Sequence, residues 1–280
     1  MSCKNTNFID KKICVVGCGG TGHELIKILI NYTKNITIID SDKIEITNLN
    51  RQFWFSKETC SMPKAEVIGK KLNIEYKVAF IQNFKSDFLN KFKIVFLCVD
   101  NIKTRMDVNL MFIQSKCNLL VDLGVEGYAC HIKKVENNST SCLYCIKDIY
   151  KIENTEPLCS LSFFKQINLE NRTKALKSLI FELQNEYDEF IVDSKITEIF
   201  NSKVNKMDLR TNEKEVYELR NTIVPSIACV NAICACLAVK IITDESNDFY
   251  FYDGSKTIYL AKEKIKKDDN CIVCKSFENI

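Results

Sequence analysis

The sequence has 280 residues, of which 46% are apolar and 27% charged, and its formal net charge is +3. This length suits one large α/β domain with a modest insert. The charge is too small, and the charged residues are too interspersed, to favour a nucleic-acid or membrane-surface partner. No apolar run approaches a membrane span and no signal peptide is evident, so we expect an intracellular, cytoplasmic or nuclear, protein.

Residues 11–40 predict the start of a dinucleotide-binding fold. A strand over 13–16 leads into a glycine-rich turn and an apolar helix, and a second strand over 36–39 ends at Asp40. Such a turn lets backbone approach a phosphate, which the helix N-terminus stabilises, and the acid at the strand end suits a ribose hydroxyl. The alternative is that the glycine-rich turn has a purely structural role. In either case the turn contains Gly17, Gly19, Gly20 and Gly22.

Cations and an acid follow at positions that suit a triphosphate. Arg51 lies in an irregular polar and aromatic segment, and Lys64 follows Pro63, which fits the first turn of a helix to about Leu72. Arg and Lys both bind phosphates, although either could be a plain surface residue. Asp100 follows a continuous apolar strand, where a carboxylate could hold Mg²⁺.

The remaining pattern predicts further strands and helices. We expect strands over 77–81, 94–99, 119–122 and 128–135, helices over 87–91, 106–116 and 227–243, a turn over 124–127, and a hairpin over 248–260 that turns at Asp253-Gly254. The helix over 227–243 is almost uniformly apolar and is expected to be deeply buried. Residues 146–220 differ in character, with helical patterns over 174–186 and 189–201, and are expected to form an inserted subdomain.

Fifteen cysteines indicate a reducing compartment, and most are interpreted as small core residues. Two C-x-x-C pairs match a four-thiolate structural zinc site, which would tie the end of the chain to its middle. Two unrelated pairs are the alternative. The four cysteines are Cys142, Cys145, Cys271 and Cys274.

Together these motifs resemble the adenylating domain of ubiquitin-activating enzymes and their bacterial ThiF- and MoeB-like relatives. The matching segments are VVGCGGTGHELIK, IIDSDKIEITNLNRQF, MPKAE, CVDNIKTR, DLGVEGY, IVPSIACVNAICA and the two cysteine pairs. The resemblance implies a Rossmann-like, doubly wound α/β sheet with a short helical catalytic-cysteine insert and a zinc clasp. The expected divisions are 1–145 and 221–280 for the adenylation domain and 146–220 for the insert.

The resemblance also implies roles. The four glycines would form the ATP turn, Asp40 would hold the ribose, and Asp100 would bind Mg²⁺. The triphosphate would be surrounded by Asn48, Arg51, Gln52 and Lys64. The substrate would be the C-terminal carboxylate of a ubiquitin-like modifier, adenylated at the α-phosphate. Both reactants are anions, so Arg51, Lys64 and the metal would neutralise charge and align the attack.

Cys159 is the candidate for a second, thioester-forming step. Pro157-Leu158-Cys159-Ser160-Leu161 resembles the thioester segment of the eukaryotic activators. The spacing from Cys145, with Tyr150 and Pro157, favours the Nedd-type (Rub-type) activators, and a SUMO- or ubiquitin-activating subunit is the alternative. A thiolate attacks an acyl adenylate readily. Alternatively, Cys159 is one more structural cysteine.

Three departures limit the resemblance. Cys130 stands where a third glycine is expected, the cysteine insert is short, and the sequence ends six residues after Cys274 without a ubiquitin-fold domain. The resemblance implies a modifier, a related non-catalytic subunit in a heterodimer, and a conjugating enzyme as partners. Other readings are adenylation without a thioester, an inactive scaffold half, and a nicotinamide-dependent oxidoreductase, which leaves the Asn48–Phe53 phrase unexplained.

Overall fold

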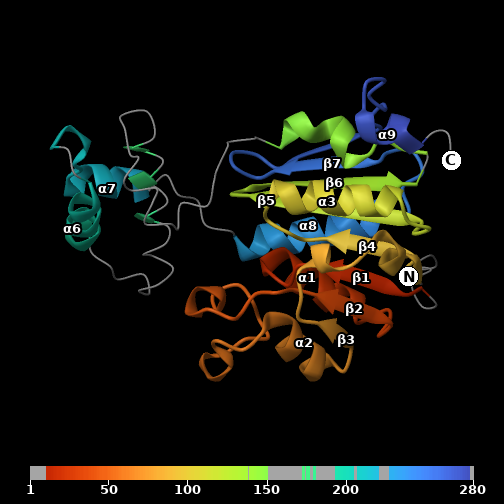
Figure 1. Ribbon diagram of the computed structural model, residues 1–280, viewed down its shortest axis with the longest axis horizontal. Coiled ribbons are helices and arrows are strands. Elements are labelled where there is room, and N and C mark those ends of the chain that lie inside the picture. The colour runs from red at the N-terminus through yellow and green to blue at the C-terminus, as the bar shows by residue number, and fades with distance from the viewer. Residues whose placement is uncertain are drawn as a thin grey trace. The chain divides into compact units, whose positions relative to one another are not determined.

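An eight-stranded mixed sheet organises most of the chain (Figure 1), in the order β3-β2-β1-β4-β5-β6-β7-β8. The first five strands in that order are parallel, and the last three are antiparallel to their neighbours. Three parallel strands are buried along their whole length, as their apolar sequences predict. The strands are β1 (Ile13–Val16), β2 (Ile36–Ile39), β3 (Glu75–Lys77), β4 (Ile94–Leu97), β5 (Leu119–Glu126), β6 (Ala129–Glu136), β7 (Phe249–Asp253) and β8 (Tyr259–Glu263).

This computed structural model describes residues 11–137, 139–150, 193–204, 207–220 and 227–277, with 172–173, 175–176 and 179–180. The chain divides into two units. The first comprises Met1–Ile44, Asn48–Lys151 and Ser226–Ile280 and contains the sheet, and the second comprises Glu45–Thr47 and Ile152–Pro225. No helix within the described ranges is long and apolar enough to cross a membrane.

Helices cover both faces of the sheet (Figure 1). On one face, α1 (Gly20–Leu29) packs against β1 and against α8 (Ala228–Ile241), α8 packs against β5 and β6, and α2 (Lys64–Leu72) packs against β2 and β3. On the other face lies α3 (Ile102–Ile113), whose Val108 and Phe112 are fully buried. Each face has its own apolar cluster, so the parallel strands lie between two layers of core.

The structure corrects the expected burial of α8. The helix is apolar almost all round, but only the side that faces α1 and the sheet is buried, through residues such as Cys234 and Ala238. Cys229 and Cys236, seven residues apart and therefore on one side of the helix, are exposed.

Several boundaries differ from those that the pattern predicts. The strand expected over 77–81 is β3, which begins two residues earlier, at Glu75. The chain can begin the strand there because Asn73, in a left-handed conformation, ends α2 just before it. The helix expected from 106 begins at Ile102, because the Asn101 side chain accepts a hydrogen bond from the Thr104 N–H (2.8 Å) and caps it.

The turn predicted over 124–127 is mostly strand. β5 continues through Gly124 to Glu126, because each of these residues pairs with β6, and only Gly127 and Tyr128 turn the chain. The hairpin predicted over 248–260 is present, but Asp253 is the last residue of β7 and the connection to β8 is longer than two residues. The helix expected over 87–91 is a 3-10 turn, Ser86–Lys91.

The second unit has an apolar cluster of its own. Its described helices include α6 (Asp193–Lys203) and α7 (Glu213–Arg220), and residues 172–173, 175–176 and 179–180 are helical. Ile196, Phe200 and Val216 are fully buried in the cluster. Both oxygens of the Glu215 carboxylate pair with the Arg172 guanidinium at 2.5 Å, a forked geometry that fixes orientation as well as charge.

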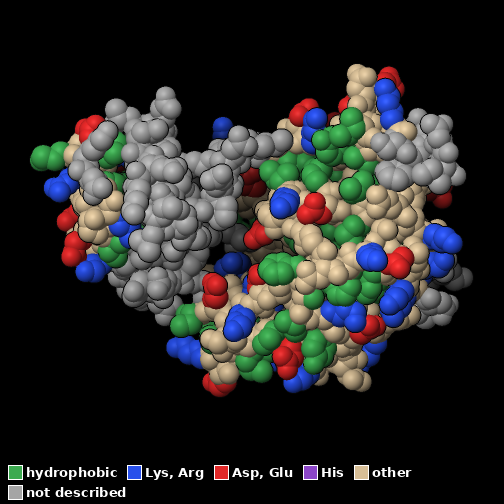
Figure 2. Space-filling model, in the orientation of Figure 1, with side chains coloured by type: hydrophobic (Ala, Val, Ile, Leu, Met, Phe, Trp, Pro, Cys, Tyr) green, Lys and Arg blue, Asp and Glu red, His purple; other side chains and the backbone are tan. Residues whose placement is uncertain are grey.

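Surface charge in the first unit is mixed. On the face in Figure 2, lysine and arginine side chains alternate with aspartate and glutamate over the described part of this unit, so this face presents no extended patch of one sign. This agrees with the small net charge of the sequence.

Candidate active site and metal centre

The glycine turn lies beyond the carboxyl end of β1, between β2 and β4. Gly17 has φ +95°, in the left-handed region, and its N–H donates to the Ile39 carbonyl (2.8 Å). A Cβ on Gly17 would lie 2.5 Å from the carbonyl oxygen of Cys98, just after β4. Backbone conformation and close approach therefore both require glycine here.

The other glycines of the turn differ in what surrounds them. A Cβ on Gly22 would lie 2.1 Å from the Gly17 carbonyl oxygen, and one on Gly20 would lie 2.5 Å from the side-chain nitrogen of Asn231. A Cβ on Gly19 would have no atom of the described residues within 4 Å, apart from its chain neighbours and its own helix. The protein's own packing thus excludes side chains at Gly22 and Gly20, whereas the space beside Gly19 is open to a ligand.

Asp40 stabilises the turn from the end of β2. Its carboxylate accepts hydrogen bonds from the backbone N–H groups of Cys18 (2.6 Å) and Asp42 (2.7 Å). Burial raises the pKa of the Asp40 carboxyl, and these two hydrogen bonds oppose that effect. Each oxygen retains lone-pair capacity. The predicted ribose contact is therefore compatible with the observed bonds, and its occurrence stays a prediction.

Both predicted phosphate-binding cations lie near protein acceptors at this edge of the sheet. The Lys64 side chain is only 10% exposed, and its Nζ is 3.0 Å from Oδ2 of Asp42, whose side chain is 64% exposed. The Nη1 of Arg51 donates to Oδ1 of Asn50 (3.0 Å). The Arg51 Cδ would lie 3.6 Å from a Cβ on Gly20, so this side chain lies beside the turn.

Asn48 and Gln52 are buried one turn apart, the Gln52 N–H donating to the Asn48 carbonyl (2.9 Å). The side-chain oxygen of Gln52 is buried without a hydrogen-bond partner among the described residues. Asp100, the predicted magnesium ligand, is exposed between β4 and α3, at the same edge of the sheet as the turn. The structure thus brings the predicted nucleotide residues to one edge, and their roles stay predictions.

Sequence reasoning missed Asn231 as a site residue. It is fully buried in α8, accepts a hydrogen bond from Oγ1 of Thr21 (2.9 Å), and contacts the turn at Gly20. The signal was present, because a single Asn in an apolar helix needs a polar partner.

A second missed feature is a buried ionic cluster around Asp122. The Asp122 carboxylate accepts hydrogen bonds from Arg105 and from the Tyr150 hydroxyl (2.8 Å), and lies 3.2 Å from Nε2 of His131. Arg105 also donates to the carbonyl of Val99. Burial acts to raise the pKa of Asp122, but Arg105 and its other partners outweigh burial and lower it. The cluster thus orders the chain next to Asp100.

His23 lies behind the turn. It is fully buried in α1, with Nδ1 2.9 Å from the Cys18 carbonyl and its ring against Trp54 and Phe55 (centroids 5.1 and 4.6 Å away). Burial lowers the pKa of His23 to about 4, against the raising effect of its backbone hydrogen bonds. The imidazole is therefore neutral at pH 7.

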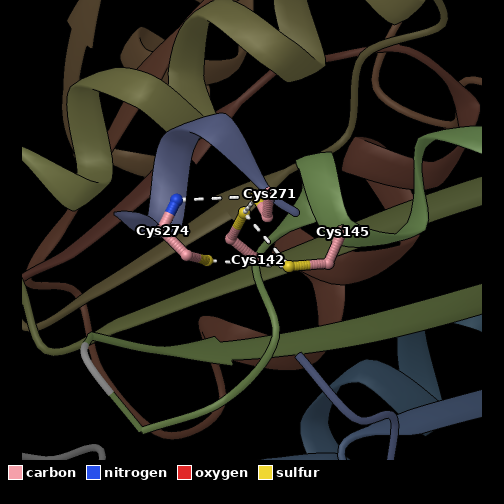
Figure 3. Close-up of side chains that lie close together, drawn as sticks. All are labelled: Cys142, Cys145, Cys271 and Cys274. Carbon is pink, nitrogen blue, oxygen red and sulfur yellow. Dashed lines mark hydrogen bonds between the residues drawn. The ribbon is translucent and has the colours of Figure 1, made fainter. Parts of the chain in front are cut away.

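The four predicted metal-ligating cysteines converge (Figure 3), although 129 residues separate the two pairs. All four Sγ atoms lie within 4.8 Å of one another. The Sγ of Cys142 lies 3.9 Å from that of Cys145 and 3.7 Å from that of Cys271, and the Sγ atoms of Cys145 and Cys274 are 3.6 Å apart. A tetrahedral zinc ion with Zn–S bonds of roughly 2.3 Å requires about 3.8 Å. The donor set therefore fits such an ion.

The surrounding structure holds the cluster in place. The first pair belongs to a 3-10 segment, η5 (Leu143–Ile149), and its flank, and the Leu143 N–H donates to Oδ1 of Asn109 in α3 (2.9 Å). The second pair belongs to α9 (Ile272–Phe277) and its flank, which pack against α3. Burial raises the pKa of the Cys142 thiol to about 11, so a cation is needed to hold it as a thiolate at pH 7.

Cys159, the predicted thioester cysteine, lies outside the described residues. The site described above therefore does not include Cys159.

The glycine environments predict opposite effects of two alanine substitutions. Gly22→Ala forces a Cβ against backbone and should lower the melting temperature by several degrees, whereas Gly19→Ala should leave it within about one degree. Thermal unfolding of the two variants side by side checks this. Equal melting temperatures would contradict the packing.

The neutral, buried His23 predicts an acid-side loss of stability. Because its pKa is lowered from about 6.5 to about 4, the unfolded chain binds a proton in this interval that the folded chain does not. The free energy of unfolding should therefore fall as the pH drops through this window, by about 3 kcal/mol in total for this group. Urea unfolding of wild type and His23→Leu at several pH values isolates the difference, and parallel curves would contradict it.

Comparisons with known proteins agree with this arrangement. The ThiF family model matches residues 6–273. The NEDD8-activating enzyme E1 catalytic subunits of Arabidopsis thaliana and Saccharomyces cerevisiae are 28% and 26% identical, over 94% and 95% of this chain. The chain spans 65% of the plant relative and 98% of the yeast one. Escherichia coli MccB with ATP superposes with a TM-score of 0.59 at 19% identity, covering 96% of this chain and 68% of that one, which shows the shared fold.

The family match covers nearly the whole chain. This chain belongs to the ThiF family.

Proposed function

We propose that this protein activates a ubiquitin-like modifier, first by adenylating the modifier's C-terminal carboxylate and then by forming a thioester on Cys159. The observation that carries the proposal is one edge of the sheet, where the space at Gly19 is open and Arg51 lies beside the next residue, Gly20. Lys64 is the first residue of α2, and Asp100 follows the end of β4 at the same edge. An acidic ligand with a phosphate chain is what such an edge can neutralise.

The relatives support a ubiquitin-like substrate. The plant and yeast proteins that align with nearly the whole chain are named as catalytic subunits of NEDD8-activating enzyme. A Dictyostelium discoideum SUMO-activating enzyme subunit is 35% identical, but over 48% of this chain. We therefore favour a Nedd-type modifier, with a related second subunit and a conjugating enzyme as further partners.

The chemistry assigns a task to each group. A carboxylate oxygen of the modifier attacks the α-phosphorus of ATP, and the bond from that phosphorus to the pyrophosphate oxygen breaks. Mg²⁺, held by Asp100, would supply positive charge to the phosphates. Arg51 and Lys64 would neutralise the rest, Lys64 exchanging the exposed Asp42 carboxylate for a phosphate. The Cys159 thiolate would then attack the acyl carbon and release AMP.

The four-cysteine cluster would hold zinc in a structural role. Four thiolates leave no open coordination position, so the ion would contribute to folding and take no part in the reaction. Structural zinc sites contribute roughly 10–16 kcal/mol of apparent binding energy in peptides. Such an ion would join α9 to the middle of the chain.

The test of function is ATP–pyrophosphate exchange with single candidate modifiers, on the chain co-purified with its second subunit, followed by non-reducing gels. Wild type should exchange with one modifier and form a reducible band. Cys159→Ala should lose the band and keep exchange within about two-fold. Arg51→Ala should lower exchange by roughly 100-fold, the scale of removing one preorganised charge.

Each other outcome favours a different function. Exchange without a thioester in wild type would indicate an adenylyltransferase that stops at the acyl adenylate. A thioester that persists in Cys159→Ala would move the nucleophile elsewhere. Absence of exchange with every modifier in the paired complex would contradict activation altogether and leave a scaffold half.

Zinc is tested by metal analysis of the purified chain. Wild type should contain one zinc per chain, and Cys271→Ser should lose most of it and melt at least 5 °C lower, because one of four ligands is removed. Cys236→Ser is the matched control, since Cys236 is exposed and outside the cluster. Unchanged zinc in Cys271→Ser would contradict the assignment.

A further inference from the structure

The side chain of His23 makes two contacts to the backbone of the glycine turn. Its Nδ1 lies 2.9 Å from the carbonyl oxygen of Cys18 and 3.2 Å from that of Gly19. Both partners are acceptors, so the hydrogen-bond pattern requires a hydrogen on Nδ1. Nε2 then carries a lone pair, and it is buried without a partner among the described residues. This tautomer leaves one donor, aimed at the turn.

The two carbonyl groups determine where the next two N–H groups point. In a trans peptide the C=O and the N–H point in opposite directions. Because the Cys18 and Gly19 carbonyls turn inward to His23, the N–H groups of Gly19 and Gly20 point away from it. Gly19 is the N-cap of α1, and Gly20 is its first residue. Amides at this end of a helix have no intrahelical acceptor.

The N-cap residue of α1 cannot fix the turn through a side-chain hydrogen bond. Gly19, the N-cap, is extended (φ −72°, ψ −163°) and has no side chain to make a cap hydrogen bond. The cap positions that usually carry Ser, Thr, Asp or Asn supply a side-chain acceptor to the first turn. Asp40 holds the Cys18 N–H, and the His23 backbone N–H donates to the Gly19 carbonyl (2.9 Å), so the Cys18 carbonyl is the group that the His23 side chain constrains.

We propose that His23 is a positioning residue: through its Nδ1–H it holds the Cys18 carbonyl inward and so presents the Gly19 N–H to a nucleotide phosphate, beside the Gly20 N–H that the helix itself orients. This rests on the proposed function, because it assumes that the turn binds ATP. Anions bind where helix N-terminal amides converge with the helix dipole. A peptide plane that rotates would withdraw one of these amides.

A competing role for His23 is packing alone, since its ring contacts Trp54 and Phe55. Two substitutions separate the roles. His23→Asn places an amide N–H at the position of Nδ1 but removes the ring. His23→Leu keeps an apolar side chain of similar bulk but removes the donor. Positioning predicts that Asn preserves ATP binding better than Leu, and packing predicts the reverse order.

The experiment measures the dissociation constant for MgATP by calorimetry and the KM values in pyrophosphate exchange, on the paired complex. His23→Leu should raise both the dissociation constant and the KM for ATP by about five-fold, the effect of one neutral hydrogen bond. Its KM for the modifier and its kcat should stay within two-fold. His23→Asn should bind ATP within two-fold of wild type, even where its melting temperature is lower. His23→Gln, whose amide lies one bond further out, should behave as Leu.

The outcomes distinguish failure of this inference from failure of the proposed function. Equal ATP affinity of the Asn and Leu variants, or weaker binding by Asn, would overturn the positioning role while the nucleotide site stands. If wild type in the paired complex bound no ATP, the nucleotide site itself would be overturned, and the role of His23 with it. A variant that does not fold is identified by its melting curve, and the Asn–Gln pair then gives the comparison.

Discussion

The hydrogen bonds of the buried Asp122 carboxylate hold together the edge of the sheet where the predicted nucleotide residues lie. It connects Arg105 on α3, His131 on β6 and Tyr150 after η5 to the centre of β5. A charge this deeply buried is tolerated only when it is paired and hydrogen-bonded, so all these elements are held to one geometry. Arg105 extends the constraint to the Val99 carbonyl, one residue before Asp100. The predicted magnesium ligand thus stands on a segment whose backbone is held by an ion pair.

The same edge holds the cations and the acid that are predicted to bind a nucleotide. Lys64 and Arg51 lie near Asp42 and Asn50, and Asp40 accepts two backbone N–H groups. Lys64 is nearly buried, while its partner Asp42 is mostly exposed. An exposed carboxylate loses little when it returns to water, so a phosphate can replace it at small cost.

The cysteine cluster and the glycine turn are ordered in two different ways. The cluster joins segments 129 residues apart through side-chain sulfur atoms. The turn is ordered locally by His23 and by Asn231, which reaches it from α8. In both cases a polar or ligating group is surrounded by apolar residues, so the surrounding core determines its position. Stability and binding geometry are therefore coupled at these sites.

The sequence by itself determined the parallel strands, the glycine turn, Asp40 at the end of β2, and the two cysteine pairs, because each depends on local pattern or on residue chemistry at fixed spacing. It also predicted that the cysteine pairs would meet. Only the tertiary structure decided that β5 continues through Gly124, because pairing with β6 overrides a turn-like sequence. It alone showed that one side of α8 is exposed. It also showed that Asn231 and His23 contact the glycine turn, and that the partners of Asp122 meet around one carboxylate. These contacts join residues up to 210 positions apart, and no local pattern encodes which buried polar group will meet which.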